Sequence, residues 1–426
     1  MKKLFLMGAA ASLLAGNLLA KDVEITFWNF PNFTGDSEFG KGDYDKELIK
    51  AFEAKNPGIK VNFTMIEFTD GPAKLETAIQ SKTNPDIVYD APGRIIDWAS
   101  KGYLAPLDDM ADKAKLNQAA VGASSFEGKL YLYPQGVAPF LMGANRGMLK
   151  DWGLDNQLPL DKPDRSWTLA QYEKLLTDIA AKAKESGKDI APAILYAKSQ
   201  GGDQGPRAYI SNLFGSWITD AKVSKYTIND EAGVKAMEWA KSAYDKGLLG
   251  KGIALDAGAS IEAFRSGLAA TTILFPVNLY KQEKAKADGI DAVLLPFPTS
   301  NGKLQLEYLV AGPCVFDNGD KDKIAASKKF IDFMINDANW GTRTLKATGT
   351  FSAKLNETGL YDDRELAYAE SMSGFYGPYY NTIPGFAQMR PLWFPMVQSV
   401  LNGDAKPKEA LDKFVKAANK TIEEAK

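Results

Sequence analysis

The side chains that most enzymes use for chemistry are scarce in this chain of 426 residues. It has no histidine and a single cysteine, Cys314, so neither a Ser-His-Asp nor a Cys-His triad, nor most zinc sites, can be built from it. Ser300 to Lys303 matches a Ser-x-x-Lys pattern, but the Asn301-Gly302 pair inside it is typical of a hairpin turn. Gly201 to Gly205 lacks the spacing of a nucleotide-binding loop. We therefore expect no catalytic residues, no metal and no cofactor.

Carboxylates are the catalytic groups that remain. The chain carries 53 Asp and Glu side chains, and a glycosidase needs only two of them about 5 to 10 Å apart across a cleft. A secreted two-carboxylate glycosidase therefore stays open as the enzyme alternative.

The N-terminal twenty residues have the pattern of a secretory signal peptide. Met1-Lys2-Lys3 precedes an apolar run from Leu4 to Leu14, and Ala20 precedes the polar pair Lys21-Asp22. We expect residues 1–20 to be removed and the mature protein to lie in the periplasm. A lipid anchor would need a cysteine just after the cut, whereas Cys314 is better explained as a small buried apolar residue.

Size and charge narrow the class of protein further. Loss of Lys2 and Lys3 with the leader changes the formal net charge from −2 to −4, which argues against a nucleic-acid partner. A mature chain of about 400 residues with 45% apolar residues exceeds what one hydrophobic core usually serves, so we expect two lobes.

The first part of the mature chain alternates between strand and helix patterns. Val23 to Trp28 predicts a strand, Asp43 to Lys55 a helix, Ile59 to Met65 a strand, Ala73 to Lys82 a helix, and Asp86 to Tyr89 a short strand. This order predicts parallel pairing and an α/β lobe.

Ligands of open α/β sheets bind outside the carboxyl ends of the strands. The loops that follow the three predicted strands combine aromatic and polar side chains. The candidates there are Trp28, Asn29, Phe30, Glu67, Asp90 and Arg94. Trp28 and Phe30 could equally be core residues, and Arg94 could form a surface ion pair with Asp90 or Asp97.

Eight short segments, spread from Ile25 nearly to the end of the chain, occur in the order found in one protein family. They are Ile25 to Trp28, Phe52 to Val61, Asn84 to Val88, Gly102 to Leu107, Gly128 to Tyr131, Trp167-Thr168, Ala326 to Ile331 and Gly403 to Leu411. Together they resemble the extracellular solute-binding proteins of carbohydrate ABC transporters, the family that includes maltose-binding protein.

The resemblance implies a two-lobed periplasmic binding protein fold of class α/β, in which each lobe is a mixed, mainly parallel sheet flanked by helices. A hinge of several segments joins the lobes, with crossings near residues 134–140, 293–298 and 335–340. The implied division is lobe one at 21–133 plus 296–335, and lobe two at 134–295 plus 336–426.

The resemblance also implies a function without chemistry. The protein would capture a mono- or oligosaccharide between its lobes and, as a monomer, deliver it to the permease subunits of an ABC transporter in the inner membrane. An anionic ligand, such as a glycerol phosphodiester or an acidic sugar, is the alternative, with Arg94, Arg207 and Arg390 as clamps.

Matching segments place further site residues in lobe two. Sugars need aromatic platforms together with planar polar groups. The candidates are Gln204, Arg207, Trp217, Phe275, Asn278, Tyr379, Arg390 and Trp393. Pro378, Pro384, Pro391 and Pro395 predict an irregular segment that suits a cleft wall. We expect Trp393 to be a platform whose replacement by alanine weakens binding and leaves the fold intact.

Overall fold

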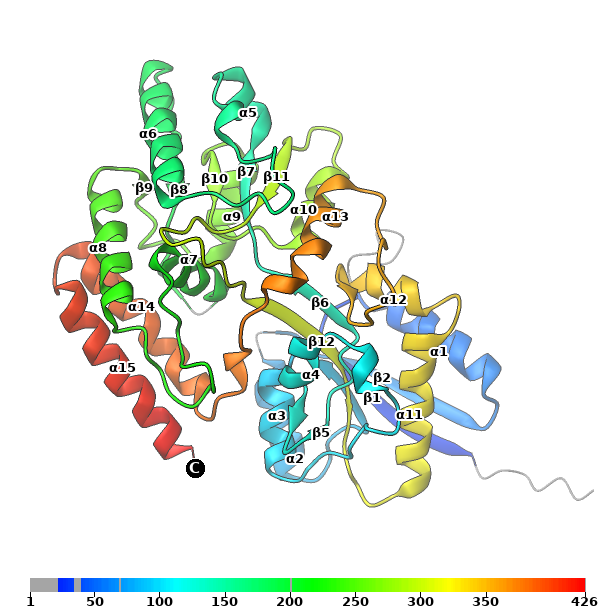
Figure 1. The fold of residues 1–426 in the computed structure, drawn as a ribbon. Coiled ribbons are helices and arrows are strands. Elements are labelled where there is room, and N and C mark those ends of the chain that lie inside the picture. The colour runs from blue at the N-terminus through cyan, green and yellow to red at the C-terminus, as the bar shows by residue number, and fades with distance from the viewer. Residues whose placement is uncertain (1–21, 34–39, 69, 200, 426) are drawn as a thin grey trace, which may run out of the picture.

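A computed structural model describes residues 22–33, 40–68, 70–199 and 201–425. The predicted signal peptide, residues 1–20, lies outside the described residues. The described chain forms two lobes, each with its own sheet and surrounding helices (Figure 1). The predicted fold class, two α/β lobes with a hinge between them, is confirmed.

Lobe one is built on a six-stranded sheet. Its strands, in spatial order, are β13 (Phe351–Ser352), β6 (Gly136–Pro139), β12 (Tyr308–Val315), β3 (Ile87–Asp90), β1 (Val23–Asn29) and β2 (Ile59–Met65). As predicted, β1 runs parallel to β2 and β3. The ladders of β12 with β3 and β6, and of β13 with β6, are antiparallel.

Among the described residues, six α-helices belong to lobe one. They are α1 (Asp43–Lys55), α2 (Gly71–Gln80), α3 (Pro92–Ser100), α4 (Gln118–Ala123), α11 (Lys321–Asn336) and α12 (Gly341–Thr348). The apolar face predicted for α1 is buried, and Phe52 packs edge-on against Phe330 of α11 at 5.0 Å. Phe330 also meets Phe27 of β1 at 5.4 Å, so aromatic contacts fix both helices on the sheet.

Lobe two has a smaller sheet in the order β10 (Thr271–Thr272), β7 (Met142–Asn145) and β11 (Ala292–Leu295). Both outer strands run antiparallel to β7, so the expectation of a mainly parallel sheet in this lobe was wrong. The reason is that β7 enters from the hinge as the central strand, opposite in direction to the two strands beside it. A separate parallel pair joins β8 (Ala193–Ile194) to β9 (Leu249–Gly250).

The other described α-helices belong to lobe two, some beside this smaller sheet and some packed against one another farther from it (Figure 1). They are α5 (Arg146–Asp151), α6 (Leu169–Glu185), α7 (Gln204–Phe214), α8 (Glu231–Asp245), α9 (Ala257–Arg265), α10 (Val277–Lys284), α13 (Arg364–Ser371), α14 (Phe386–Asn402) and α15 (Pro407–Glu424). Helix α6 begins with a capping box between Thr168 and Gln171.

The backbone of α14 differs from the irregular segment that was expected there. Pro391 and Pro395 predicted irregular backbone, but they lie inside a continuous helix of 17 residues. A proline removes one hydrogen bond from a helix interior. Burial of one side of α14, including Trp393 and Val397, against α15 and α8 offsets that loss.

The chain passes between the sheets three times: from β6 to β7, from β11 to β12, and from β13 to α13. The pairing of β6 and β13 puts both strands in the sheet of lobe one, although the expected division assigned them to lobe two. Residues 299–301 instead bond to lobe two, where the Ser300 amide donates to the Leu213 carbonyl at 2.9 Å. These long-range pairings have no local sequence signal.

Candidate functional site

The carboxyl ends of β1, β2 and β3 meet at one edge of the larger sheet, since Asn29 pairs with both Met65 and Tyr89. Helix α3 starts at this edge and reaches lobe two. A Cβ atom placed on Gly93 would lie 3.1 Å from the carbonyl oxygen of Asn381, in the short helix η4 (Tyr380–Thr382). The edge predicted to bind a ligand is therefore where the lobes meet.

An aromatic pair lies at this edge. The rings of Phe30 and Phe68 stack at 5.0 Å with an interplanar angle of 6°. Phe30 is fully buried, whereas Phe68 is 57% exposed. The guanidinium of Arg94 lies 5.1 Å from the centre of the Phe30 ring. Phe68 thus presents a flat apolar surface to solvent, backed by a second ring and close to a cation.

Asp90 and Arg94 form a two-point ion pair beside these rings. Arg94 Nε donates to Asp90 Oδ2 at 2.6 Å, and Arg94 Nη2 donates to Asp90 Oδ1 at 2.7 Å. The Asp90 carboxylate is buried, while 37% of the Arg94 side chain is exposed. Burial lowers the pKa of Arg94, but the charge and hydrogen bonds of Asp90, with smaller effects of Glu76 and Tyr379, together raise the pKa above its ordinary value. Of the two partners considered for Arg94, Asp90 is the one observed.

Tyr379 continues the site from lobe two. Its ring meets Tyr308 edge-on at 5.3 Å, and Tyr308 in turn stacks on Tyr376 at 4.2 Å. Burial raises the pKa of the Tyr379 phenol, and the charge of Asp90 raises it further. Tyr379 therefore lies within electrostatic reach of the Asp90–Arg94 pair of lobe one.

A cluster of charged groups follows, which we call the junction charge cluster: Asp203, Arg207, Glu307, Tyr380 and Arg390. Arg390 donates to both oxygens of Asp203, at 2.8 and 2.9 Å. Arg207 is fully buried, pairs with Asp203, lies 3.7 Å from Glu307, and donates from Nε to the Tyr380 hydroxyl at 2.5 Å. Tyr380 in turn donates to Glu307.

The cluster contains two cations and two carboxylates, so its formal charges cancel. Burial raises the pKa of Glu307 to about 7, although Arg207 and the Tyr380 hydroxyl lower it. Glu307 precedes β12, Arg207 lies on α7 and Tyr380 on η4. The cluster therefore ties the second crossing of the chain to lobe two.

The structure brings several predicted residues together at the junction, namely Phe30, Asp90, Arg94, Arg207, Tyr379 and Arg390. Gln204 begins α7 beside Asp203. Asn278 of α10 lies against Gly349, where a Cβ atom would come within 2.8 Å of the Asn278 Cβ. Half-buried Trp28 and Trp217 lie in β1 and after α7.

Other predicted residues have structural roles. Asn29 is fully buried, and its amide donates to Asp45 at 2.7 Å. Trp393 and Phe275 are fully buried, so neither can present a ring face to a ligand here. Trp393 packs edge-on against Phe414 at 5.3 Å, and Phe275 against Phe264 at 5.0 Å. The expected platform at Trp393 is corrected to a core residue between α14 and α15.

Glu67 is exposed and ion-paired with Lys41. Its neighbour Phe68 was missed by sequence reasoning, because a phenylalanine beside a strand is usually a core residue. The available signal was its place in the loop after β2. In the described part of the chain, no group of three His, Cys, Asp or Glu side chains could hold a metal ion.

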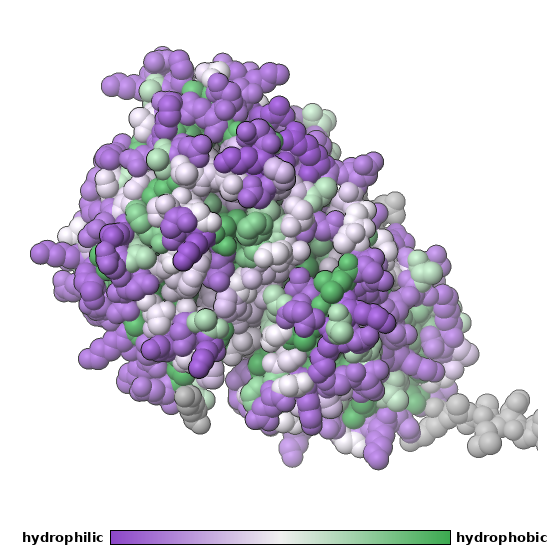
Figure 2. Space-filling view, viewed as in Figure 1, coloured by the Kyte–Doolittle hydropathy of each residue, from purple (hydrophilic) through white to green (hydrophobic). Residues whose placement is uncertain are grey.

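On the face shown in Figure 2, both lobes are mainly hydrophilic along their outer edges, and paler side chains lie where the lobes meet. Among the described residues, no helix is both long and apolar enough to cross a membrane.

Comparison with known proteins agrees with this architecture. A family model for bacterial extracellular solute-binding proteins matches residues 47–356. A putative binding protein of Brucella abortus is 24% identical over 425 residues, which covers 95% of this chain and 94% of the relative. A galactooligosaccharide-binding protein of Bacillus subtilis is 23% identical over 386 residues, which covers 88% of this chain and 86% of that relative.

Solved structures share the whole fold. An ABC substrate-binding protein of Listeria monocytogenes, in complex with cycloalternan, has a TM-score of 0.75 at 20% identity, covering 95% of this chain and all of that one. The GacH receptor of Streptomyces glaucescens, solved unliganded and with acarbose, has a TM-score of 0.76 at 22% identity. The match covers 96% of this chain and all of the receptor chain.

Proposed function

The chain belongs to the bacterial extracellular solute-binding protein family, and we propose that it is the substrate-binding component of an ABC importer for an uncharged carbohydrate. A mono- or oligosaccharide would enter between the lobes in the periplasm and be passed, unaltered, to the permease subunits. Similar proteins support a sugar ligand, since one relative is a galactooligosaccharide-binding protein and two similar folds were solved with cycloalternan and acarbose.

The observation that carries the proposal is the exposed face of Phe68 beside the Asp90–Arg94 pair. Sugars present flat C–H faces together with pairs of hydroxyl groups. The Phe68 ring can stack on such a face, and the exposed part of Arg94 can donate to neighbouring hydroxyls.

Charge pairing favours an uncharged ligand over an anionic one. The three arginines expected to clamp an anion are Arg94, Arg207 and Arg390, and each is already paired with a carboxylate. An anion would have to compete with Asp90 or Asp203 for these donors.

We further propose that the moving units follow the sheets. Lobe one would comprise residues 22–139 and 308–352, and lobe two residues 140–307 and 353–425. This division keeps every ladder of the larger sheet in one unit and assigns the junction charge cluster to lobe two, so that closure brings Tyr379 and Arg94 together around the ligand.

Titration calorimetry of the mature protein tests the proposal. The panel should contain neutral saccharides (maltotriose and galactotriose) and charged ligands (galacturonate and a glycerol phosphodiester). We expect heat of binding with a neutral saccharide, and recovery of that saccharide unchanged by chromatography. Binding restricted to the charged ligands would support the anionic alternative, and release of shorter sugars would support a glycosidase.

The Phe68→Ala variant tests the platform itself. Loss of the ring should weaken binding of the neutral saccharide at least ~tenfold, because an aromatic platform contributes on the order of 1 to 3 kcal/mol. The melting temperature should hardly change, since Phe68 is exposed. Leu355→Ala is the matched control, because Leu355 is 58% exposed and outside the junction. Equal affinities of the two variants would remove Phe68 from the site.

A further inference from the structure

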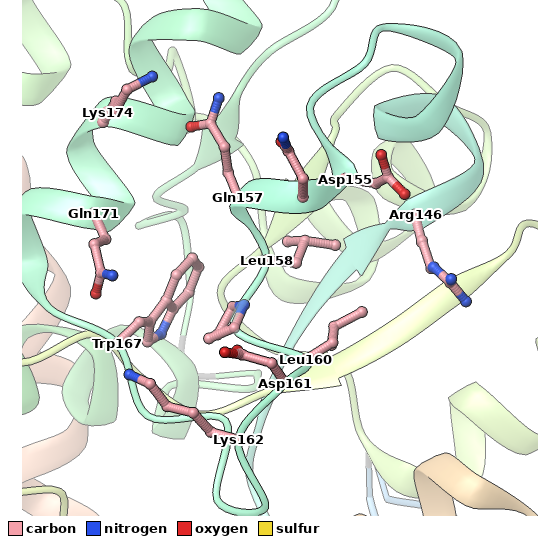
Figure 3. Close-up of a pocket in the computed structure, with 12 residues that line it drawn as sticks. Arg146, Asp155, Gln157, Leu158, Leu160, Asp161, Lys162, Trp167, Gln171 and Lys174 are labelled. Atoms are coloured by element: carbon pink, nitrogen blue, oxygen red, sulfur yellow. The ribbon is translucent and has the colours of Figure 1, made fainter.

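Lobe two contains a cavity that takes no part in the junction (Figure 3). Its volume is about 630 Å³, within the range of 300 to 1,000 Å³ that is usual for small-molecule sites. All of its lining residues lie between Arg146 and Lys174, and none belongs to the junction. They come from the start of α5, the short helix η2 (Asp155–Gln157), the loop after it and the first turns of α6.

The cavity has an apolar floor and a polar rim. Leu158, Pro159 and Trp167 form the floor, and all three are buried. Polar side chains from separate elements, among them Arg146, Gln157 and Asp161, also line the cavity (Figure 3). This combination suits a ligand with both C–H surface and hydroxyl groups.

The walls of the cavity are held in place by buried hydrogen bonds. The Trp167 indole donates to the Pro296 carbonyl at 2.9 Å, and Arg165 Nη1 donates to the Leu294 carbonyl at 2.7 Å. Arg165 has a φ of 49°, which is costly for a residue other than glycine. Its buried ion pair with Glu365 holds it there. The cavity is thus preformed, because hydrogen bonds hold the loop that precedes α6 to the end of β11.

The charges on the rim are mixed and leave free hydrogen-bonding capacity. Among the described residues, the side chains of Arg146, Asp155 and Asp161 have no hydrogen-bond or ion-pair partner. Lys174 is paired with Asp178, and Lys162 donates to the Ser166 carbonyl. Gln157 Oε1 is buried without a partner in the same described region. Free donors and acceptors of both signs favour a neutral ligand rich in hydroxyl groups.

We propose that this cavity is a second carbohydrate site, which binds a neutral saccharide on lobe two alone. Since every lining residue lies between Arg146 and Lys174, binding here needs no closure of the lobes. The site goes beyond the proposed transport function, and it would exist even if the junction bound another kind of molecule.

Hydrogen exchange of the mature protein, with maltotriose, galactotriose or cellotriose added at millimolar concentration, tests the proposal. We expect slower exchange in residues 155–162 with at least one of these sugars. The protection should be lost in Asp155→Ala/Asp161→Ala, which removes two free acceptors, and in Asn156→Trp, which fills the cavity from an exposed position. Asp151→Ala, exposed and outside the cavity, should retain it.

The outcomes separate the two proposals. Protection of residues 155–162 in the parent, together with no heat of saccharide binding in Asp155→Ala/Asp161→Ala, where the junction is the proposed site that remains, would overturn the transport proposal alone. Absence of protection with all three sugars, or protection that survives in both cavity variants, would overturn the second site. Protection that depends on protein concentration rather than on sugar would mean that a second copy of the chain covers the cavity, and would also overturn it.

Discussion

Each arginine at the lobe junction faces a carboxylate that neutralises it. Arg94 is held by Asp90 and Arg390 by Asp203, and Arg207 lies between Asp203 and Glu307. Residue types alone predicted donors at this place but left their partners open. Burial also decided between aromatic residues that look alike in sequence, since Trp393 is enclosed while Phe68 is open to solvent. Exposure depends on distant packing, so local sequence could not assign it.

Trp393→Ala should therefore change stability rather than recognition. The indole is fully buried between α14 and α15, and truncation of a buried tryptophan typically costs about 3 to 5 kcal/mol. Denaturant unfolding should show a loss of this size, with saccharide affinity of the remaining folded protein unchanged. Trp217→Ala, at a half-buried tryptophan of the same lobe, should lose clearly less. A stable Trp393→Ala protein with weak binding would restore Trp393 to the site.

Asp45 should make stability depend on pH. Burial raises the pKa of its carboxyl from 3.8 to about 6, although the hydrogen bond from Asn29 lowers it. The folded state thus holds this proton more tightly than the unfolded state. Asp45 therefore contributes to the free energy of unfolding. This contribution is fully present below about pH 4 and is lost as the pH rises to about 6.

Asp45→Asn should remove this part of the slope of unfolding free energy against pH. Urea titrations at several pH values between 4 and 8 would measure it. Asp43→Asn, at an exposed position in the first turn of the same helix, is the control and should keep the slope of the parent. Parallel curves for the parent and Asp45→Asn would contradict the prediction.

At the scale of elements, the periodic segments were the predictable ones. Strands β1 and β2 and helix α1 follow their sequence patterns nearly to the residue, because each combines a clear apolar face with turn residues at an end. Strands β6 and β13 are short, and only their pairing across more than 200 residues identifies them. The same long-range pairing decides which lobe each crossing belongs to.

Gly312 connects the packing of strand β12 to the site, because it pairs with Asp90 of β3. A Cβ atom there would lie 1.8 Å from the carbonyl oxygen of Tyr133, a backbone atom that cannot rotate away. Gly312→Ala should therefore destabilise the fold by roughly 1 to 3 kcal/mol or more and weaken saccharide binding by displacing Asp90.

Thermal unfolding and calorimetry of Gly312→Ala would measure both effects. Gly122→Ala is the matched control, because a Cβ atom at that helical position meets nothing within 4 Å. It should be neutral or slightly stabilising, since alanine is the better helix former. If Gly312→Ala were as stable as this control, the prediction would be wrong, and β12 could shift without loss of unfolding free energy.

At the scale of the whole molecule, the described parts of the two lobes are joined by three crossings and also contact each other elsewhere. The sequence predicted this architecture, because the eight family segments span nearly the whole mature chain, but it did not locate the contacts between the lobes. One of these contacts is the approach of Gly93 in α3 to Asn381 in η4. It adjoins Arg94 and Tyr379, so the state in which it forms is also the state in which the two halves of the site are together.

A disulfide across this contact should lock the lobes. In Gly93→Cys/Asn381→Cys the Cβ atoms would lie 4.0 Å apart, within the range that a disulfide requires. The only native thiol, Cys314, is fully buried, so oxidation should join the new pair. A ligand that bridges the lobes favours the closed state, and oxidation should be faster with saccharide present.

Once oxidised without ligand, the protein should bind saccharide at least tenfold more slowly in stopped-flow measurements, and reduction should restore the rate. Each single cysteine variant should bind at the parental rate under both conditions. Unchanged association in the oxidised double variant would mean that the ligand enters without separation of the lobes at α3 and η4.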